Sequence, residues 1–125
     1  MSRSSDTARI ISKTSTAIQG EGTATTNLQQ GLAKAWAQVD GDPVGLNDSF
    51  NVASATDVAT GRFDIAFTNN ISNTTYAVSA ETDKQAMRIE DGYIAASGFR
   101  VTTELTSGTD SDAVYAMFST HGDLA

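Results

Sequence analysis

Apolar and polar residues alternate along the middle of the chain, and this alternation is its clearest structural signal. Between Asn47 and Val78, apolar residues recur at every second position of three short runs: Phe50, Val52, Phe63, Ile65, Phe67, Tyr76 and Val78. A period of two is typical of a β-strand with one buried face. With a turn at Thr60-Gly61, the pattern predicts three consecutive strands whose apolar face is covered by a second sheet.

The stretch from Gly31 to Asp40 is predicted to be the strand that precedes this meander. Ala33, Ala35, Ala37 and Val39 share one face, and Lys34, Trp36 and Gln38 share the other. A face of small side chains indicates that another layer approaches closely. Trp36 then lies on the opposite face. It is interpreted either as a partly buried core or edge residue, or as a contact across a subunit interface, where tryptophan gives a large area with few rotatable bonds.

The C-terminal third of the chain repeats the same pattern. Strands are predicted at Ala86–Ile89, Tyr93–Ala95, Phe99–Leu105 and Ala113–Thr120, and Glu90-Asp91-Gly92 is a strong turn signal. The last strand is apolar on both faces, which fits a central position or a subunit contact. Seven or eight short strands predict an all-β fold, an antiparallel β-sandwich that is jelly-roll-like. The expected core residues are Phe50, Phe63, Ile65, Phe67, Val78, Phe99 and Val101.

The first 31 residues differ from the rest because large apolar side chains are few among Ser, Thr, Gly and Gln. Such a segment cannot form a core alone. We therefore predict an extended N-terminal arm, 1–31, and a sandwich body, 32–125. The arm either orders against another subunit or is a disordered tail, and 25–30 has the composition of one short helical turn.

Charge is distributed unevenly between these two parts. The net charge is −7; residues 1–32 carry three basic and two acidic side chains, and residues 33–125 carry five basic and thirteen acidic ones. The acidic body argues against binding to nucleic acid and to an anionic membrane surface. The chain has no cysteine, which excludes disulfides and thiol chemistry, and no apolar run long enough to insert into a membrane.

Residues able to do chemistry are sparse, and we expect no enzymatic activity. His121 is the only histidine and has no nucleophile motif near it. Two Asp-x-Asp pairs, Asp40/Asp42 and Asp110/Asp112, are weak candidates for calcium, since hard cations favour clustered oxygen ligands from loops. The alternative is that these carboxylates are solvated turn residues. No other cofactor is expected.

For binding of a glycan, exposed aromatic residues beside Asp or Asn are the expected chemistry. Tyr93 is the best placed, next to the Glu90-Asp91-Gly92 turn. Asp91 and Trp36 complete the candidate receptor contacts. The alternative is that these aromatic residues belong to the core or to an interface.

Several of these segments together resemble a module of structural proteins in tailed bacteriophages, particularly marine ones. The motifs, within a match from Asn27 to the C-terminal strand, are LAKAWAQVDGD at Leu32–Asp42, Ser49–Ser54, Thr60-Gly61, Phe63–Thr68 and Asn73–Val78. The sequence departs from the pattern at Asp57-Val58-Ala59, where the family has a more polar turn.

The resemblance implies a non-enzymatic fibre or appendage protein of the virion, assembled in the host cytoplasm. It further implies a homotrimer that contacts other virion proteins of the head or tail and serves adhesion to the host surface. The arm would anchor it through Arg3, Arg9, Ile10, Ile11 and Lys13. A capsid decoration or cement protein is the main alternative, and a small calcium-dependent lectin outside any virion is a third.

Overall fold

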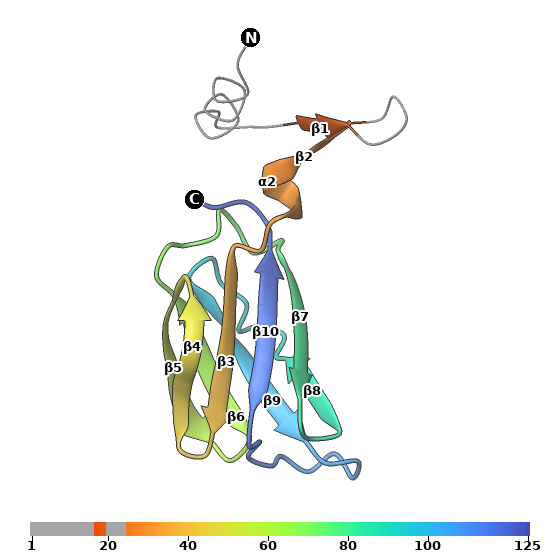
Figure 1. Ribbon diagram of the computed structural model, residues 1–125. Coiled ribbons are helices and arrows are strands. Elements are labelled where there is room, and N and C mark those ends of the chain that lie inside the picture. Colours follow the sequence, from red (N-terminus) through yellow and green to blue (C-terminus); the bar gives the residue numbers. More distant parts are fainter. Residues whose placement is uncertain (1–16, 20–24) are drawn as a thin grey trace. The chain divides into compact units, whose positions relative to one another are not determined.

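The computed structural model describes residues 17–19 and 25–125 (Figure 1). The chain forms two units, Met1–Leu32 and Ala33–Ala125. In the first unit, β1 (Ala17–Gln19) pairs antiparallel with β2 (Thr25–Asn27), and the helical turn α2 (Leu28–Gly31) follows. The helical turn predicted for 25–30 thus begins at residue 28, because β2 occupies the residues before it.

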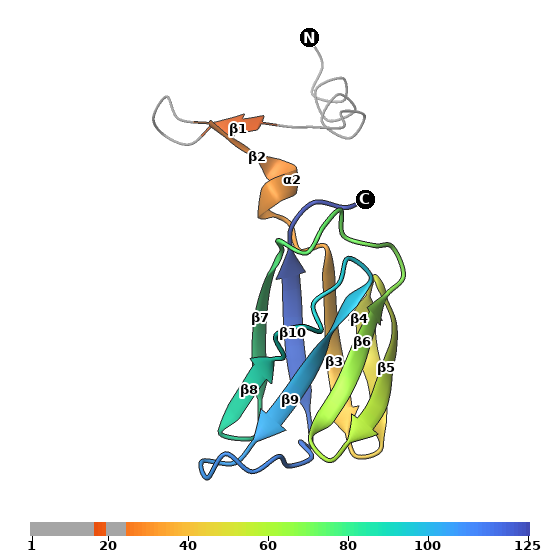
Figure 2. The same cartoon turned by 180° about the vertical axis from the view of Figure 1, so that it is seen from behind.

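The second unit is a sandwich of two four-stranded antiparallel sheets (Figures 1 and 2). One sheet has the order β4-β3-β10-β7, from β3 (Ala35–Gly41), β4 (Val44–Phe50), β7 (Ala77–Thr82) and β10 (Ala116–His121). The other has the order β5-β6-β9-β8, from β5 (Val52–Ala59), β6 (Arg62–Phe67), β8 (Ala86–Ile89) and β9 (Gly98–Glu104). The predicted all-β antiparallel sandwich is confirmed.

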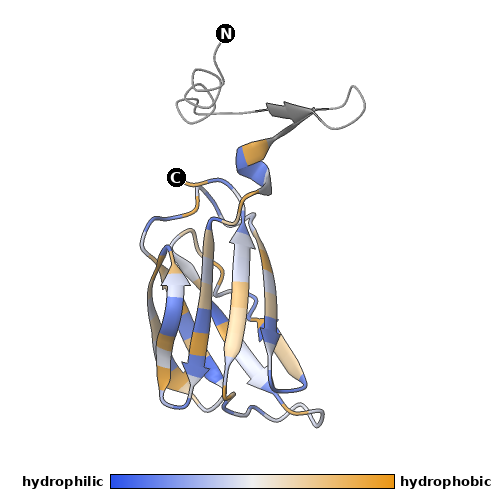
Figure 3. Ribbon diagram, in the orientation of Figure 1, coloured by the Kyte–Doolittle hydropathy of each residue, from blue (hydrophilic) through white to orange (hydrophobic). Residues whose placement is uncertain are grey.

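The core lies between the two sheets and is built from the alternating residues. Polar and apolar bands follow one another along the strands in Figure 3. The buried apolar cluster consists of Ala35, Ala37, Val39, Val52, Phe63, Ile65, Phe67, Ile71, Phe99, Val101, Ala116 and Phe118. The small face of β3 admits the large side chains of the opposite sheet, as the alanine pattern predicts. Burying each large side chain stabilises the fold by about 1.5–3 kcal/mol.

Phe50 does not belong to this core, and its predicted burial is wrong. Its side chain is 54% exposed at the end of β4. Asn51 has a φ of 56°, in the left-handed region, and turns the chain from one sheet into the other. Phe50 and Val52 therefore lie on different strands of different sheets. Val78, also predicted as core, is only partly buried.

The predicted meander also breaks after its second strand. β5 pairs with β6, but β7 lies in the opposite sheet, between β10 and solvent. The segment 93–95 is not a strand and has a single bridge, from Ala95 to Gly98. The last strand begins at Ala116 and not at residue 113.

β10 lies in the middle of its sheet, between β3 and β7, as its apolar character predicts. The first and last strands of the body, β3 and β10, are neighbours in their sheet. The backbone N–H of Lys34 donates to the carbonyl of Thr120 at 2.7 Å, so the chain enters and leaves the body at the same end. Among the described residues, no helix is long and apolar enough to cross a membrane.

Candidate functional site

The candidate receptor contacts lie on opposite sides of the sandwich. Trp36 projects from the outer face of β3, whereas Tyr93 lies in the loop between β8 and β9, over the outer face of the other sheet. Asp91 is exposed in the same turn, and its carboxylate accepts a hydrogen bond from the N–H of Gly92 at 3.0 Å. The structure therefore brings Tyr93 and Asp91 into one loop and leaves Trp36 apart from them.

The ring of Tyr93 is occupied by an intramolecular contact. The Cζ atom of Arg100 lies 3.9 Å from its centroid, which is the geometry of a cation–π interaction. Asp64 holds the same guanidinium through two hydrogen bonds, Nε to Oδ1 at 2.6 Å and Nη2 to Oδ2 at 3.0 Å. The hydrogen bond from Arg100 lowers the pKa of Asp64, and the same bond raises the pKa of Arg100. Arg100 thus covers one face of the Tyr93 ring, and only the other face can contact a ligand.

A shallow hollow lies beneath the Tyr93 loop, where β9 approaches β6. Tyr93, Asp64 and Gly98 are among the residues around this space of about 280 Å³. A Cβ on Gly98 would lie 1.9 Å from the carbonyl oxygen of Ile65, so β9 approaches β6 closely here. The hydroxyl of Tyr76 lies 2.9 Å from the carbonyl oxygens of Ala95 and Gly98 and fixes the loop from below.

Ion pairs link β6, β8 and β9 on this outer face. The body has three arginines, Arg62, Arg88 and Arg100. Arg62 pairs with Asp110 at 2.8 Å and Glu90 at 3.4 Å, Arg88 pairs with Glu104, and Arg100 pairs with Asp64. The charged side chains over β6, β8 and β9 are therefore paired with one another.

The outer face of the other sheet is different, and we call it the Trp36 face. It carries Phe50, Trp36, Ser119 and Ser79 in one row across the four strands, and Asp48, Gln38, Met117 and Glu81 in the next. Trp36 is 40% exposed, and its cross-strand partner is the exposed Phe50. Two exposed aromatic side chains thus lie next to each other on a flat sheet surface.

Sequence reasoning identified Trp36 on this face but missed its neighbours. Phe50 was assigned to the core, since its spacing to Val52 mimics a continuous strand. Met117 lies on the face of β10 opposite Phe118. The pairing of β10 with both β3 and β7, which brings Ser79 and Glu81 to this surface, involves segments far apart in the chain and has no local sequence signal.

The predicted calcium pairs have structural partners within the protein. Asp112 Oδ1 accepts a hydrogen bond from the N–H of Gly61 at 2.6 Å, and Asp110 pairs with Arg62. Asp40 Oδ1 accepts from the N–H of Asp42 at 3.2 Å. The contacts of Asp110 and Asp112 tie the 106–112 loop to the β5–β6 turn, whereas the hydrogen bond of Asp40 is local to its own turn. Among the described residues, no group of three or more His, Asp or Glu side chains is placed to hold a metal ion.

Two other predicted groups contribute nothing to a described site. His121 ends β10, and no hydrogen bond joins its side chain to a nucleophile in the part of the chain that the structure describes. Arg3, Arg9, Ile10, Ile11 and Lys13, the predicted anchor, lie outside the described residues. Comparisons with protein-family models, with curated proteins and with solved structures find no match.

Proposed function

We propose that this chain is a non-enzymatic fibre or appendage module of a tailed-phage virion, which contacts the host surface through the Trp36 face. The observation that carries the proposal is the exposed aromatic pair formed by Trp36 and Phe50 on adjacent strands. Exposed aromatic side chains are enriched at recognition surfaces because they supply much contact area and lose little rotamer freedom. The resemblance of Leu32–Val78 to phage structural modules supports the virion context.

The two outer faces favour this assignment over contact through Tyr93. On the β5-β6-β9-β8 sheet, the charged residues neutralise one another and Arg100 covers one face of the Tyr93 ring. A partner would have to break these contacts to bind there. On the Trp36 face, no such network occupies the aromatic rings among the described residues, so a partner can bind with little rearrangement.

The experiment combines location with competition. Antibody against the body should label intact particles of the phage that carries the gene, and the purified chain should reduce adsorption of those particles to host cells. The Trp36→Ala protein should compete less well, whereas Tyr93→Ala, altered on the opposite face, should compete normally. Absence of label from particles, or equal competition by both variants, would contradict the proposal.

The arm is proposed to supply attachment to the virion. Residues 1–32 carry a net positive charge while the body is acidic, and every strand of the sandwich lies beyond residue 34. Deleting residues 2–26 should therefore leave a body that melts cooperatively but is not incorporated into particles. Incorporation of the truncated chain at normal occupancy would place attachment in the sandwich instead.

A further inference from the structure

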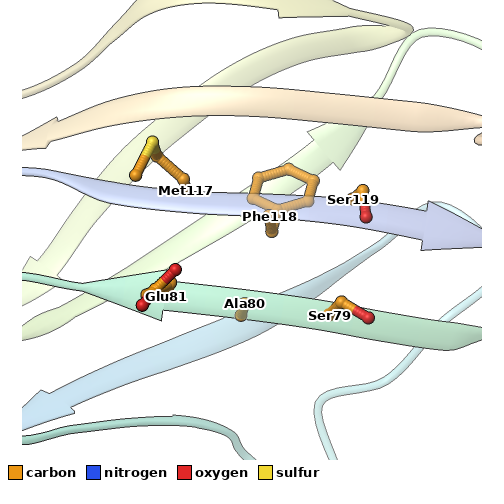
Figure 4. Close-up of a pocket in the computed structure, with 6 residues that line it drawn as sticks. All are labelled: Ser79, Ala80, Glu81, Met117, Phe118 and Ser119. Atoms are coloured by element: carbon orange, nitrogen blue, oxygen red, sulfur yellow. The ribbon is translucent and has the colours of Figure 1, made fainter.

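A hollow lies over β7 and β10 on the Trp36 face (Figure 4). It has a volume of about 270 Å³, and Ser79 and Glu81 of β7 lie around it with Met117 and Ser119 of β10. Ser119 is the cross-strand neighbour of Trp36. The two serines are small, so the surface sinks between the indole of Trp36 and the edge strand β7.

The groups around this hollow combine flat apolar area with hydrogen-bonding oxygens. In the first row, Trp36 and Phe50 are followed by the hydroxyls of Ser119 and Ser79. In the adjacent row, the amide of Gln38 lies between the carboxylate of Asp48 and the side chain of Met117. A pyranose ring has one apolar C–H face and a rim of hydroxyl groups. Such a ring matches this pattern, because its C–H face packs on an aromatic ring while carboxylates and hydroxyls bind its rim.

Charge restricts the partner further. Asp48 and Glu81 are exposed on these two rows, and none of the eight residues of the Trp36 face is basic. The three arginines of the body lie on the other sheet, each already paired with an acid. An anionic ligand on these two rows would meet like charge from Asp48 and Glu81, while the basic residue on this side of the chain, Lys34, precedes β3 and lies outside both rows. A second copy docked face to face would bring these carboxylates close to their own equivalents, which disfavours it as the occupant.

We propose that the Trp36 face is a binding site for an uncharged glycan. One pyranose ring of the glycan stacks on Trp36, and the hydroxyls of this ring and of the next sugar donate to Glu81 and exchange hydrogen bonds with Ser119 and Ser79 in the hollow. Neutral sugars donate hydroxyl hydrogens to carboxylates without charge repulsion, and the exposed face requires no opening of the sandwich. The inference rests on the proposed function, since it names the chemical class that the adhesion surface recognises.

The test is binding of the full-length chain to an array of neutral and acidic glycans, followed by calorimetry on the neutral glycan with the strongest signal. We expect binding to neutral glycans only. Trp36→Ala should weaken it by at least about tenfold, the loss expected for a stacked aromatic anchor. Trp36→Phe should retain much of the affinity, and Tyr93→Ala should bind as the wild type does.

Three results would overturn the inference: no signal for any neutral glycan, a preference for acidic glycans, or unchanged affinity of Trp36→Ala. A fourth is a change in molecular mass of Trp36→Ala in light scattering, which would show that the face joins copies of the chain. Circular dichroism of each variant shows whether it is folded. If the antibody labels intact particles but the array gives no glycan signal, the glycan site alone is refuted. If the chain binds a neutral glycan but the antibody does not label the particles, the virion role alone is refuted.

Discussion

Asn51 is the residue at which the sandwich changes sheets, and its replacement tests that account of the corner. Its backbone has a φ of 56°, and its side chain joins three segments. Nδ2 donates to the carbonyls of Lys34 and Asn69, both at 3.0 Å, and Oδ1 accepts from the N–H of Asn69 at 2.7 Å. Asparagine suits the position because it tolerates the left-handed region and carries both a donor and an acceptor.

Two substitutions separate the backbone contribution from the side-chain contribution. Asn51→Gly keeps access to the positive φ and loses the hydrogen bonds, of which one is partly buried and the others exposed. At about 1 kcal/mol for a typical bond and less for exposed ones, we expect a loss of about 2 kcal/mol. Asn51→Ala loses the same bonds and adds about 1 kcal/mol for a left-handed alanine, about 3 kcal/mol in all.

Urea unfolding followed by circular dichroism measures both losses, and equal slopes in urea for all three proteins would show that the midpoints report stability. Asn51→Asp is a third variant, because it keeps the acceptor for Asn69 and loses both donors, and it should fall between wild type and Asn51→Gly. If Asn51→Ala and Asn51→Gly unfold at the same urea midpoint, the fold does not require a positive φ at residue 51. Losses below about 0.5 kcal/mol for both would refute the corner role altogether.

Four further outcomes follow from the structure. Phe67→Ala should lower the free energy of unfolding by about 3–5 kcal/mol, because Phe67 is 6% exposed and packs against Phe99; a loss under about 1 kcal/mol in urea unfolding would contradict its place in the core. Thr120→Val should raise stability by about 1 kcal/mol, since the buried hydroxyl of Thr120 has no hydrogen-bond partner among the described residues; a lower melting temperature would show that the hydroxyl is hydrogen-bonded. Burial raises the pKa of Tyr76 from 10.0 to about 12, so the contribution of Tyr76 to stability is complete below pH 10 and is lost as the pH rises through 12; tyrosinate absorbance should show a titration near pH 12 that Tyr76→Phe removes, and an unchanged absorbance curve for that variant would refute it. Light scattering should give three times the chain mass of 13.1 kDa for the proposed homotrimer, and a stable monomer at micromolar concentration would exclude it.

Local alternation predicted the strands whose two faces differ most in burial. On β3 and β6 every second residue is buried, and the apolar pattern alone assigned the correct face of each. β9 is buried on nearly its whole length, and here too the alternation located the strand. These faces could be predicted because burial acts on each residue through its own position in the strand.

Sheet membership could not be predicted in the same way. The spacing of Phe50 and Val52 is identical whether a strand continues or turns at Asn51, so the pattern favoured the simpler interpretation. The decisive contacts come from Lys34 and Asn69, which are 17 and 18 positions away. The candidate site has the same origin, since Ser119 lies beside Trp36 only through pairing across most of the chain.

The antiparallel pairing of β3 with β10 has a mechanical consequence. Pulling the two ends of the body apart would load the Lys34–Thr120 hydrogen bond first and then open the pairs in succession, as a zipper opens. A force that enters β3 from its N-terminal side and leaves through the side chain of Trp36 crosses only the first two residues of the strand. The pairs of β3 with β4 and β10 beyond Trp36 would carry almost none of it. A load applied to the Trp36 face would therefore bypass the zipper, and the sandwich would stay folded under a pull that acts along this short path.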